Sequence, residues 1–360
     1  MTVRAGRRAT ATAIALTASI TAGLGLLLTG CGPEDATGAD DPNPSATSTA
    51  NGTGGTSTGT PNGSGGTSGG GATATPVVSK APASAPPLNG TAHNGLTISD
   101  GTRFVVMNGT RVDFGTAVRD LAWSPDGRKA AFVDGDGDLA VSDPDGSGRT
   151  VVAKNPGGQT WSHPTWQVRP ADPDNGLPRL NELIFAGRKD GVAKLYGVPA
   201  TGHNAKPSVL SLNHYSGEDI KQLPQTGNVW PSAAGTHGTS VYANTADGQV
   251  YIRDDYLRQQ GSAITKGSEP AFAPGDDEGF VFVRSVGGHD HLFRETSGNN
   301  GPVFKDLTPN ATTDYTEPAF SPDGRTVAAR TPNGIVTLPA NGSKAPVKVS
   351  GYVGLPAYRG

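Results

Sequence analysis

Cysteine is almost absent from this chain of 360 residues, because Cys31 is the only one. The part downstream of Cys31 has none, so a folded domain there owes nothing to disulfides. Long apolar runs are also missing: beyond the first 30 residues there is no run of about 18 apolar residues, the length that a membrane-spanning helix needs. No segment of the mature chain is therefore expected to span a membrane.

A surplus of basic residues is missing too. The chain has 29 Lys and Arg against 32 Asp and Glu. Removing the arginines of an N-terminal signal, Arg4, Arg7 and Arg8, leaves 26 basic residues and a net charge of −6. Binding to nucleic acid needs a basic stripe that neutralises phosphates, so nucleic acid is not an expected ligand.

The N-terminus is typical of a bacterial lipoprotein signal peptide, predicted for residues 1–30. A basic region is followed by a stretch of small and apolar residues from Ala11 to Leu28, and Leu28-Thr29-Gly30-Cys31 fits a lipobox. Lipidation of Cys31 would anchor the mature protein on the extracytoplasmic face of the cell membrane. A secretory signal with an incidental cysteine is the alternative, and the Arg7-Arg8 pair leaves both Sec and twin-arginine export open.

Residues 31–92 are predicted to be a disordered tether. They are rich in Gly, Ser, Thr, Ala and Pro, contain no aromatic residue after Cys31, and include one lysine, Lys80. Such a segment cannot bury enough apolar surface to fold. We interpret it as a flexible spacer that holds the next domain away from the membrane.

The most informative motif is a repeated heptapeptide. Pro318–Gly324 nearly copies Leu121–Gly127, and Pro270–Pro274 is a partial third copy. Ser-Pro-Asp-Gly in the two full copies matches a type I β-turn. A motif that recurs at intervals of tens of residues indicates one supersecondary unit repeated around a closed or stacked array.

Each repeat reads as four short antiparallel strands joined by turns rich in Gly, Asn and Asp, which is the pattern of a propeller blade. The first-strand aromatic residue, or its replacement, recurs at Trp123, Trp166, Ala233, Phe272, Phe320 and Tyr358. Most intervals lie near the roughly 40–45 residues of a four-stranded blade. The longer interval from Trp166 to Ala233 places extra residues in loops at 170–178 and 214–227.

The two ends of the domain complement one another. Tyr358 lies in a first strand with no blade after it, whereas Leu96–Ser99, Phe104–Met107 and Arg111–Phe114 read as second, third and fourth strands with no first strand. We therefore predict an all-β fold over residues 93–360. It is a six-bladed β-propeller whose last blade is closed by N- and C-terminal strands, which removes exposed sheet edges.

The Trp/Phe-Ser-Pro-Asp-Gly repeats resemble those of the TolB-like six-bladed propeller family. The resemblance covers roughly residues 94–360 and implies a scaffold rather than an activity. The family's namesake carries an α/β domain before its propeller, and this chain has the predicted tether there instead, so a Tol–Pal role is not implied. The adjacent Asp and Gly also differ from the Asp-box of sialidases, which has a residue between them.

Propellers bind ligands at the central channel, so the residue before each anchor proline (or Leu121) is a candidate rim residue. In chain order these residues are Asp120, His163, Trp230, Glu269, Glu317 and Leu355. We expect the first five to converge on one opening that suits a cation, a cationic peptide or a sugar. The alternative is that each acid before a proline caps the turn into its blade.

Two other clusters have the residue types of metal ligands. Asp134, Asp136 and Asp138 are spaced like the start of a calcium loop, although Leu139 stands where an EF-hand needs glycine. A solvated hairpin turn explains them equally, because Asp-Gly is a favoured hairpin pair. His289 and His291 lie on one side of a possible strand but have no second ligand cluster nearby in sequence. No cofactor is predicted, with calcium as the alternative.

These features favour a non-catalytic, lipid-anchored protein that binds or scaffolds a cell-envelope protein, peptide or glycan, with a monomeric propeller. No catalytic triad is recognisable in the sequence. A calcium-dependent hydrolase or lactonase acting in the channel is the alternative, supported only by the acidic rim. A sensory lipoprotein is a third hypothesis that no residue of the chain tests.

Overall fold

A computed structural model describes residues 88–360, apart from 213–221, 235, 257–259 and 276–278. The predicted signal peptide, the lipidation site Cys31 and the predicted tether up to residue 87 lie outside the described residues. The part that is described already makes tertiary contacts at its start, since Asn89 forms a β-bridge to Ser350. Across the described ranges, none of the helices is both long enough and apolar enough to cross a membrane.

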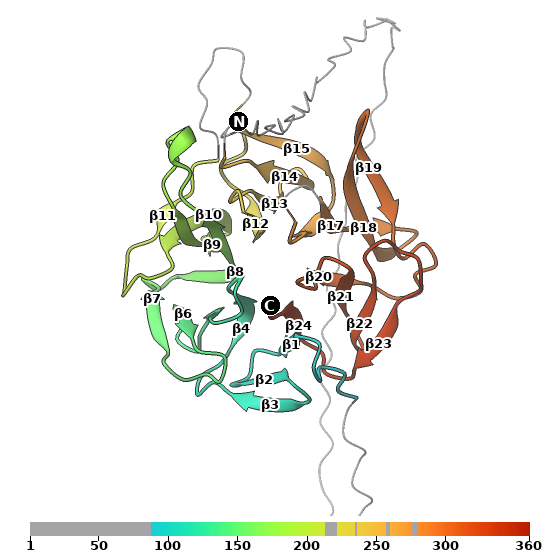
Figure 1. The fold of residues 1–360 in the computed structure, drawn as a ribbon, viewed down its shortest axis with the longest axis horizontal. Coiled ribbons are helices and arrows are strands. Elements are labelled where there is room, and N and C mark those ends of the chain that lie inside the picture. The colour runs from blue at the N-terminus through green and yellow to red at the C-terminus, as the bar shows by residue number, and fades with distance from the viewer. Residues whose placement is uncertain (1–87, 213–221, 235, 257–259, 276–278) are drawn as a thin grey trace, which may run out of the picture. The chain divides into compact units, whose positions relative to one another are not determined.

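The described residues form six four-stranded antiparallel sheets arranged as blades around a centre (Figure 1). Listed from the innermost strand outward, the first three blades are β24 (Leu355–Tyr358), β1 (Leu96–Ser99), β2 (Phe104–Met107), β3 (Thr110–Asp113); β4 (Arg119–Trp123), β5 (Ala130–Val133), β6 (Leu139–Ser142), β7 (Thr150–Ala153); β8 (Gln159–Arg169), β9 (Leu180–Lys189), β10 (Val192–Pro199), β11 (Ser208–Val209). The other three are β12 (Asn228–Ala233), β13 (Ser240–Asn244), β14 (Gln249–Arg253), β15 (Gly261–Lys266); β16 (Ser268–Phe272), β17 (Phe280–Val286), β18 (His289–Gly298), β19 (Gly301–Asp306); β20 (Thr316–Phe320), β21 (Thr326–Thr331), β22 (Gly334–Pro339), β23 (Val347–Ser350). The predicted six-bladed propeller is confirmed.

The predicted closure of the last blade by N- and C-terminal strands is also confirmed: this blade is the one formed by β24, β1, β2 and β3. Strand β24 pairs antiparallel with β1, with Leu96 opposite Tyr358 and Ser99 opposite Leu355. One blade thus takes its innermost strand from residues 355–358 and its outer three from residues 96–113. The ring therefore closes by backbone hydrogen bonds between segments far apart in sequence, so that β1 is paired on both sides and its edge is not left open.

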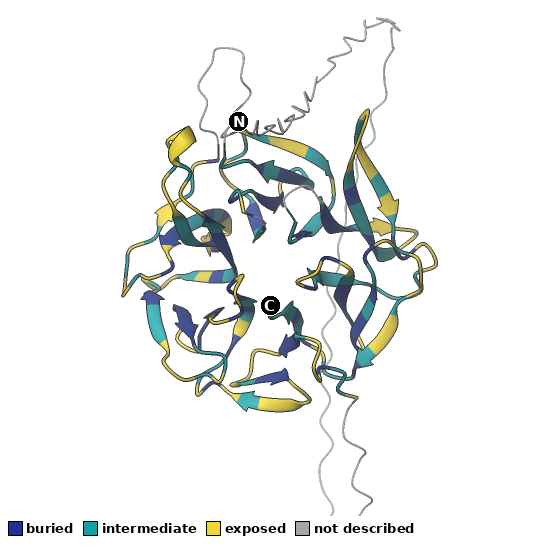
Figure 2. Ribbon diagram, in the orientation of Figure 1, coloured by how far each residue is buried: buried dark blue, intermediate teal, exposed yellow. Residues whose placement is uncertain are grey.

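The core consists of apolar layers between neighbouring blades. Trp123 and Phe132 pack with Val105 between the first two blades, and equivalent clusters fill the other five junctions. The middle strands are accordingly buried on both faces: all four residues of β5 are inaccessible to solvent, whereas outer strands such as β3 and β19 expose half or more of their residues (Figure 2). Packing between blades is therefore the main stabilising contribution, since it removes apolar area from water.

Two of the first-strand tryptophans also make polar contacts to the preceding blade. Trp123 donates its indole N–H to Thr97, and Trp166 donates to the carbonyl of Ala122. Each of these tryptophans therefore fills the space between two blades and fixes their relative position at the same time. Phe272 and Phe320 have no hydrogen-bonding group and can only fill the equivalent space.

The long interval between Trp166 and Ala233 has two structural sources. Strands β8 and β9, with 11 and 10 residues, are longer than the two outer strands of their blade. A single-turn 3₁₀ helix (Pro173–Asn175) lies in the predicted loop at 170–178. The second predicted loop, 214–227, lies largely outside the described residues.

Candidate functional site at the closed end of the central channel

A cavity of about 510 Å³ occupies the centre of the propeller. All six innermost strands line it, and no lining residue precedes the candidate rim position in its strand. The lining continues from there to the Ser-Pro turns at the other end of the strands, at Pro125 and Pro322. Residues Asp120, His163, Trp230, Glu269 and Glu317 therefore form one end of the cavity, and we call them the floor residues.

The same backbone feature places all five floor residues. Each has a positive φ, between 49° and 54°, and each lies at a shift in strand register, for example between Ser268 and Ala271. Such a β-bulge re-aims a side chain out of the regular alternation of the strand. A left-handed conformation costs a non-glycine residue roughly 1 kcal/mol. Because five different positions share it, the conformation belongs to the repeat and not to one side chain.

Leu355 does not join this group. It is not among the residues with positive φ, and β24 pairs with β1 without a register shift. It lines the cavity as an apolar residue instead. The structure thus brings together the five residues predicted as a binding rim, and it places them at the inner end of a cavity lined by the rest of each strand.

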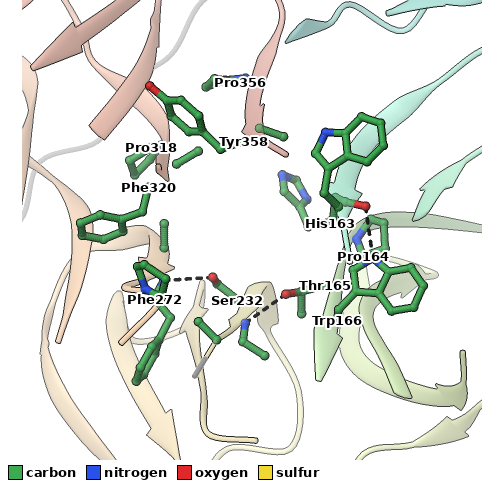
Figure 3. A pocket seen from close by; sticks show the side chains of 18 of the residues that line it. His163, Pro164, Thr165, Trp166, Ser232, Phe272, Pro318, Phe320, Pro356 and Tyr358 are labelled. Carbon is green, nitrogen blue, oxygen red and sulfur yellow. Dashed lines mark hydrogen bonds between the residues drawn. The ribbon is translucent and has the colours of Figure 1, made fainter. Parts of the chain in front are cut away.

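A histidine and a glutamate meet across the channel. His163 lies in β8 of the third blade and Glu317 in β20 of the sixth, which are opposite one another in a ring of six (Figure 1). Their Nε2 and Oε2 atoms are 3.3 Å apart. Figure 3 shows His163 projecting between the strands into the cavity. This pair joins opposite walls and closes the channel at the floor.

The acidic floor residues also bind the backbone of the next blade. The Asp120 carboxylate accepts the His163 amide at 3.1 Å, and the Glu269 carboxylate accepts the Glu317 amide at 2.6 Å. These contacts give the carboxylates a structural role related to the predicted turn capping. The amide that each carboxylate binds belongs to the neighbouring bulge, so the carboxylates connect adjacent blades.

The floor has unequal protonation behaviour. Burial, and then the negative charge of Glu317, raises the pKa of Glu269 to about 7. Burial alone would also raise the pKa of Glu317, but the hydrogen bond and charge of His163, with the charge of Arg330, lower it. Burial alone would lower the pKa of His163, but Glu317, Asp120 and Glu269 raise it. The floor therefore holds a charged His163–Glu317 pair beside a carboxyl group that titrates near neutrality.

Trp230 supplies the aromatic part of the floor. Its ring lies 6.0 Å from the His163 ring, edge to face. The indole lowers the pKa of Glu317, which places it near that carboxylate, although its N–H makes no hydrogen bond of ordinary geometry with a described residue. The floor thus presents carboxylates, an imidazole and an aromatic ring to the same space.

Between the floor and the turns, the walls are mainly proline, alanine and aromatic residues. Proline follows the floor position in five blades, at Pro164, Pro231, Pro270, Pro318 and Pro356. The innermost strand is an edge strand that faces the channel, where proline's missing N–H breaks no ladder. Two wall hydroxyls, Thr165 and Ser232, accept backbone amides of Ala233 and Phe272 in the next blade (Figure 3).

The predicted calcium ligands lie elsewhere, in the hairpin between β5 and β6. The Asp134 carboxylate accepts the amides of Asp136 and Asp138 and pairs with Arg149, and Asp138 accepts the Asn155 amide. These contacts occupy the carboxylates of Asp134 and Asp138 within the hairpin and fit the alternative interpretation, in which the two residues form a hairpin turn. Within the described ranges, no group of three His, Cys, Asp or Glu is placed to hold a metal ion.

The two strand histidines also have separate acidic partners. His289 lies 3.2 Å from Asp314, and His291 lies 2.9 Å from Asp306. His291 is buried, so its contact with Asp306 belongs to the packing of β18 against its neighbours. The two imidazoles do not converge.

Arg330 in β21 is the site residue that the sequence did not reveal. It acts on both Glu269 and Glu317 electrostatically and donates a hydrogen bond to Thr316. Its signal in the sequence is weak, because it lies in the second strand of its blade while all other floor groups come from first strands. Only the register between β20 and β21, in which Thr316 pairs with Arg330, brings it near.

The fold and cavity together define a class of protein: a six-bladed β-propeller whose central cavity is closed at one end by charged residues. No family model and no curated protein matches the sequence. Among solved structures, TolB from Acinetobacter baumannii aligns with a TM-score of 0.52 at 17% identity, covering 73% of this chain and 65% of that protein. A protein assigned as TolB from Agrobacterium tumefaciens aligns at 0.47 and 16% identity, covering 71% and 90%.

The described residues therefore form a propeller with a TolB-like fold, as the repeats predicted. At these identities the likeness concerns the fold alone. The chain spans less than two thirds of the Acinetobacter protein, so nothing about that protein's partners transfers with the fold.

Proposed function

We propose that this protein is a non-catalytic, lipid-anchored propeller on the extracytoplasmic face of the cell membrane, and that its central cavity binds a partner from the cell envelope. The observation that carries the proposal is the convergence of five functional side chains at the end of a 510 Å³ cavity. A cavity of this size with a few convergent polar groups is the usual form of a binding site. The lipobox around Cys31 supports the location.

The experiment uses the purified protein, immobilised, to capture partners from envelope extract. The triple variant Asp120→Asn, Glu269→Gln, Glu317→Gln neutralises the floor, and capture should fall at least tenfold. The matched control Asp145→Asn, Asp174→Asn, Asp190→Asn removes three exposed carboxylates and should capture normally. Equal capture by both triple variants would exclude the floor as the binding site.

The anchor is tested separately in cells. Cys31→Ser should abolish incorporation of a labelled fatty acid into the protein, because Cys31 is the only cysteine in the chain. Labelling of the variant at the wild-type level would contradict the lipoprotein assignment.

One observation favours an enzyme as the second candidate. Glu269 and Glu317 are neighbouring carboxyl groups whose pKa values are shifted in opposite directions, which is the arrangement of an acid–base pair. For the calcium-dependent version, calorimetric unfolding with EDTA and then with calcium is decisive. A rise in melting temperature with calcium would show that the native state binds the ion and would favour this candidate. No rise would favour the binding protein.

A further inference from the structure

The floor carries more acidic than basic groups. Three carboxylates, from Asp120 in β4, Glu269 in β16 and Glu317 in β20, face one imidazole from His163 in β8. Arg330 in β21 is the other cation that acts on the two glutamates. With all groups ionised, three negative charges meet two positive ones, so one carboxylate has no cation of its own.

Of the three, Glu269 is the carboxylate that lies within ion-pair distance of no described cation, and Arg330 and His163 act on it only at longer range. Its Oε2 atom accepts the Glu317 amide, and this is its one hydrogen bond to the part of the chain that the structure describes. Asp120 and Glu317 both lie near the His163 ring, at 3.8 and 3.3 Å, whereas Glu269 forms no ion pair with any described residue. It lines the cavity, so its remaining oxygen is available to a donor that enters.

The shape of the cavity restricts what such a donor can be. The His163–Glu317 pair lies across the channel at the floor. The walls above it are mainly proline, alanine and aromatic side chains. These walls offer few side-chain partners for the many hydroxyl groups of a sugar. They suit an alkyl chain with one charged end, which is the amphipathic form of a lysine or arginine side chain.

Trp230 adds a second feature suited to a cation. An aromatic face within about 6 Å attracts an ammonium or guanidinium group, most strongly where water is excluded. The Trp230 ring lies beside His163, a group that is itself positively charged when protonated, at 6.0 Å. The floor therefore already places one cation among carboxylates and an aromatic ring.

We infer that the cavity receives a lysine or arginine side chain of a partner protein, with its charged end on Glu269 beside Glu317 and its alkyl part along the proline and alanine walls. This inference rests on the proposed binding function and narrows the partner to a protein with an exposed basic residue. His163 and the incoming cation then share the carboxylates of the floor.

The test uses two defined peptides and the whole purified protein. The first is acetyl-Gly-Gly-Lys-Gly-Gly-amide, and the second has norleucine in place of lysine, which keeps the alkyl chain and removes the charge. Ligand-observed NMR should show saturable binding of the lysine peptide and at least tenfold weaker binding of the norleucine peptide. This comparison uses the wild-type protein, so it does not depend on whether a variant folds.

Glu269→Gln should weaken lysine-peptide binding at least tenfold, while Asp145→Asn, an exposed carboxylate, should leave it unchanged. Binding should also strengthen roughly tenfold between pH 6 and pH 8, because Glu269 ionises near pH 7 and the bound cation favours its charged form.

Three results would overturn the inference: equal binding of the two peptides, lysine-peptide binding that Glu269→Gln does not change, or saturable binding of chitotriose with none of the lysine peptide. The capture experiment separates these failures from failure of the proposed function. If floor-dependent capture persists while the lysine peptide does not bind, the cavity binds a partner by other chemistry and only the present inference falls.

Discussion

At the scale of single residues, Glu269 is the group whose ionisation most clearly lowers the free energy of unfolding. Its pKa is raised to about 7 in the folded protein, above the ordinary value of 4.5. Between these two values the folded state binds more protons than the unfolded state, so this group lowers stability as pH rises through the window. At 1.36 kcal/mol per pKa unit, the full penalty above pH 7 is at most about 3 kcal/mol.

Glu269→Gln should therefore stabilise the protein at pH 8 and have little effect at pH 5. The amide oxygen of glutamine can still accept the Glu317 amide, so the contact between blades is kept. Thermal unfolding of variant and wild type at both pH values measures the difference. Asp145→Asn serves as the control and should show no such trend. A difference in melting temperature that does not change with pH would contradict the assigned cause.

The convergence of the floor residues was predictable from sequence, because equivalent positions of a repeat lie at the same distance from the axis. Their pairing was not. His163 meets Glu317 because the third and sixth blades of a six-bladed ring are opposite, and it reaches across only because a bulge turns it inward. The φ of a single residue depends on its tertiary context, and the sequence His163-Pro164 does not predict the positive φ of His163.

At the scale of elements, the Ser-Pro-Asp-Gly turn explains why its sequence recurs. In both full copies the serine hydroxyl donates to the aspartate at 2.6 Å and accepts the amide of the residue five positions further on, at 2.9 Å. The aspartate also accepts the amide two residues on, at 3.1 Å. The serine and aspartate side chains thus bind each other and the backbone amides that follow the turn, which made this element recognisable without a structure.

Ser321→Ala should lower the free energy of unfolding by about 1–2 kcal/mol. The Ser321 side chain is buried, and its loss leaves the Thr326 amide without the hydroxyl that accepts its hydrogen bond. Ser124→Ala should cost a similar amount for the same reason. Ser147→Ala is the matched control: that serine also bonds an aspartate but is exposed, and its loss should stay within about 0.5 kcal/mol. Urea unfolding compares the three variants, and equal costs would refute the role given to burial.

In the third blade, the repeat predicted the position of the first strand but not the lengths of its two innermost strands. The repeat gave Trp166 as its anchor, and the structure places Trp166 in β8, but the lengths of β8 and β9 did not follow from the repeat. Their extensions are held by contacts to the fourth blade, such as the Arg169 guanidinium on the Asp255 carbonyl and the Gln167 amide on Asp255. Contacts between blades of different length have no counterpart in the repeat, so its period cannot reveal them.

At the scale of the whole molecule, stability depends on closing the ring. Strand β24 supplies the inner edge of its blade and covers Leu96 and Ile98, both nearly inaccessible to solvent. It also connects two junctions, because Ala357 packs against the cluster of Trp123 and Tyr358 packs against the cluster of Ile335. Without β24, one blade loses its first strand and two apolar layers lose a wall.

A chain lacking residues 355–360 should therefore lose its cooperative unfolding transition or melt at a much lower temperature than wild type. The deletion exposes the edge of β1 and the apolar side chains behind it, and an exposed strand edge promotes aggregation. Light scattering should accordingly increase along with the loss of the transition in calorimetry. Removing six residues from the Gly/Ser/Thr/Pro-rich segment at 51–56 is the control and should leave melting unchanged. If the chain without β24 melted like wild type, the other five blades would be stable as an open array, and closure would contribute little to folding.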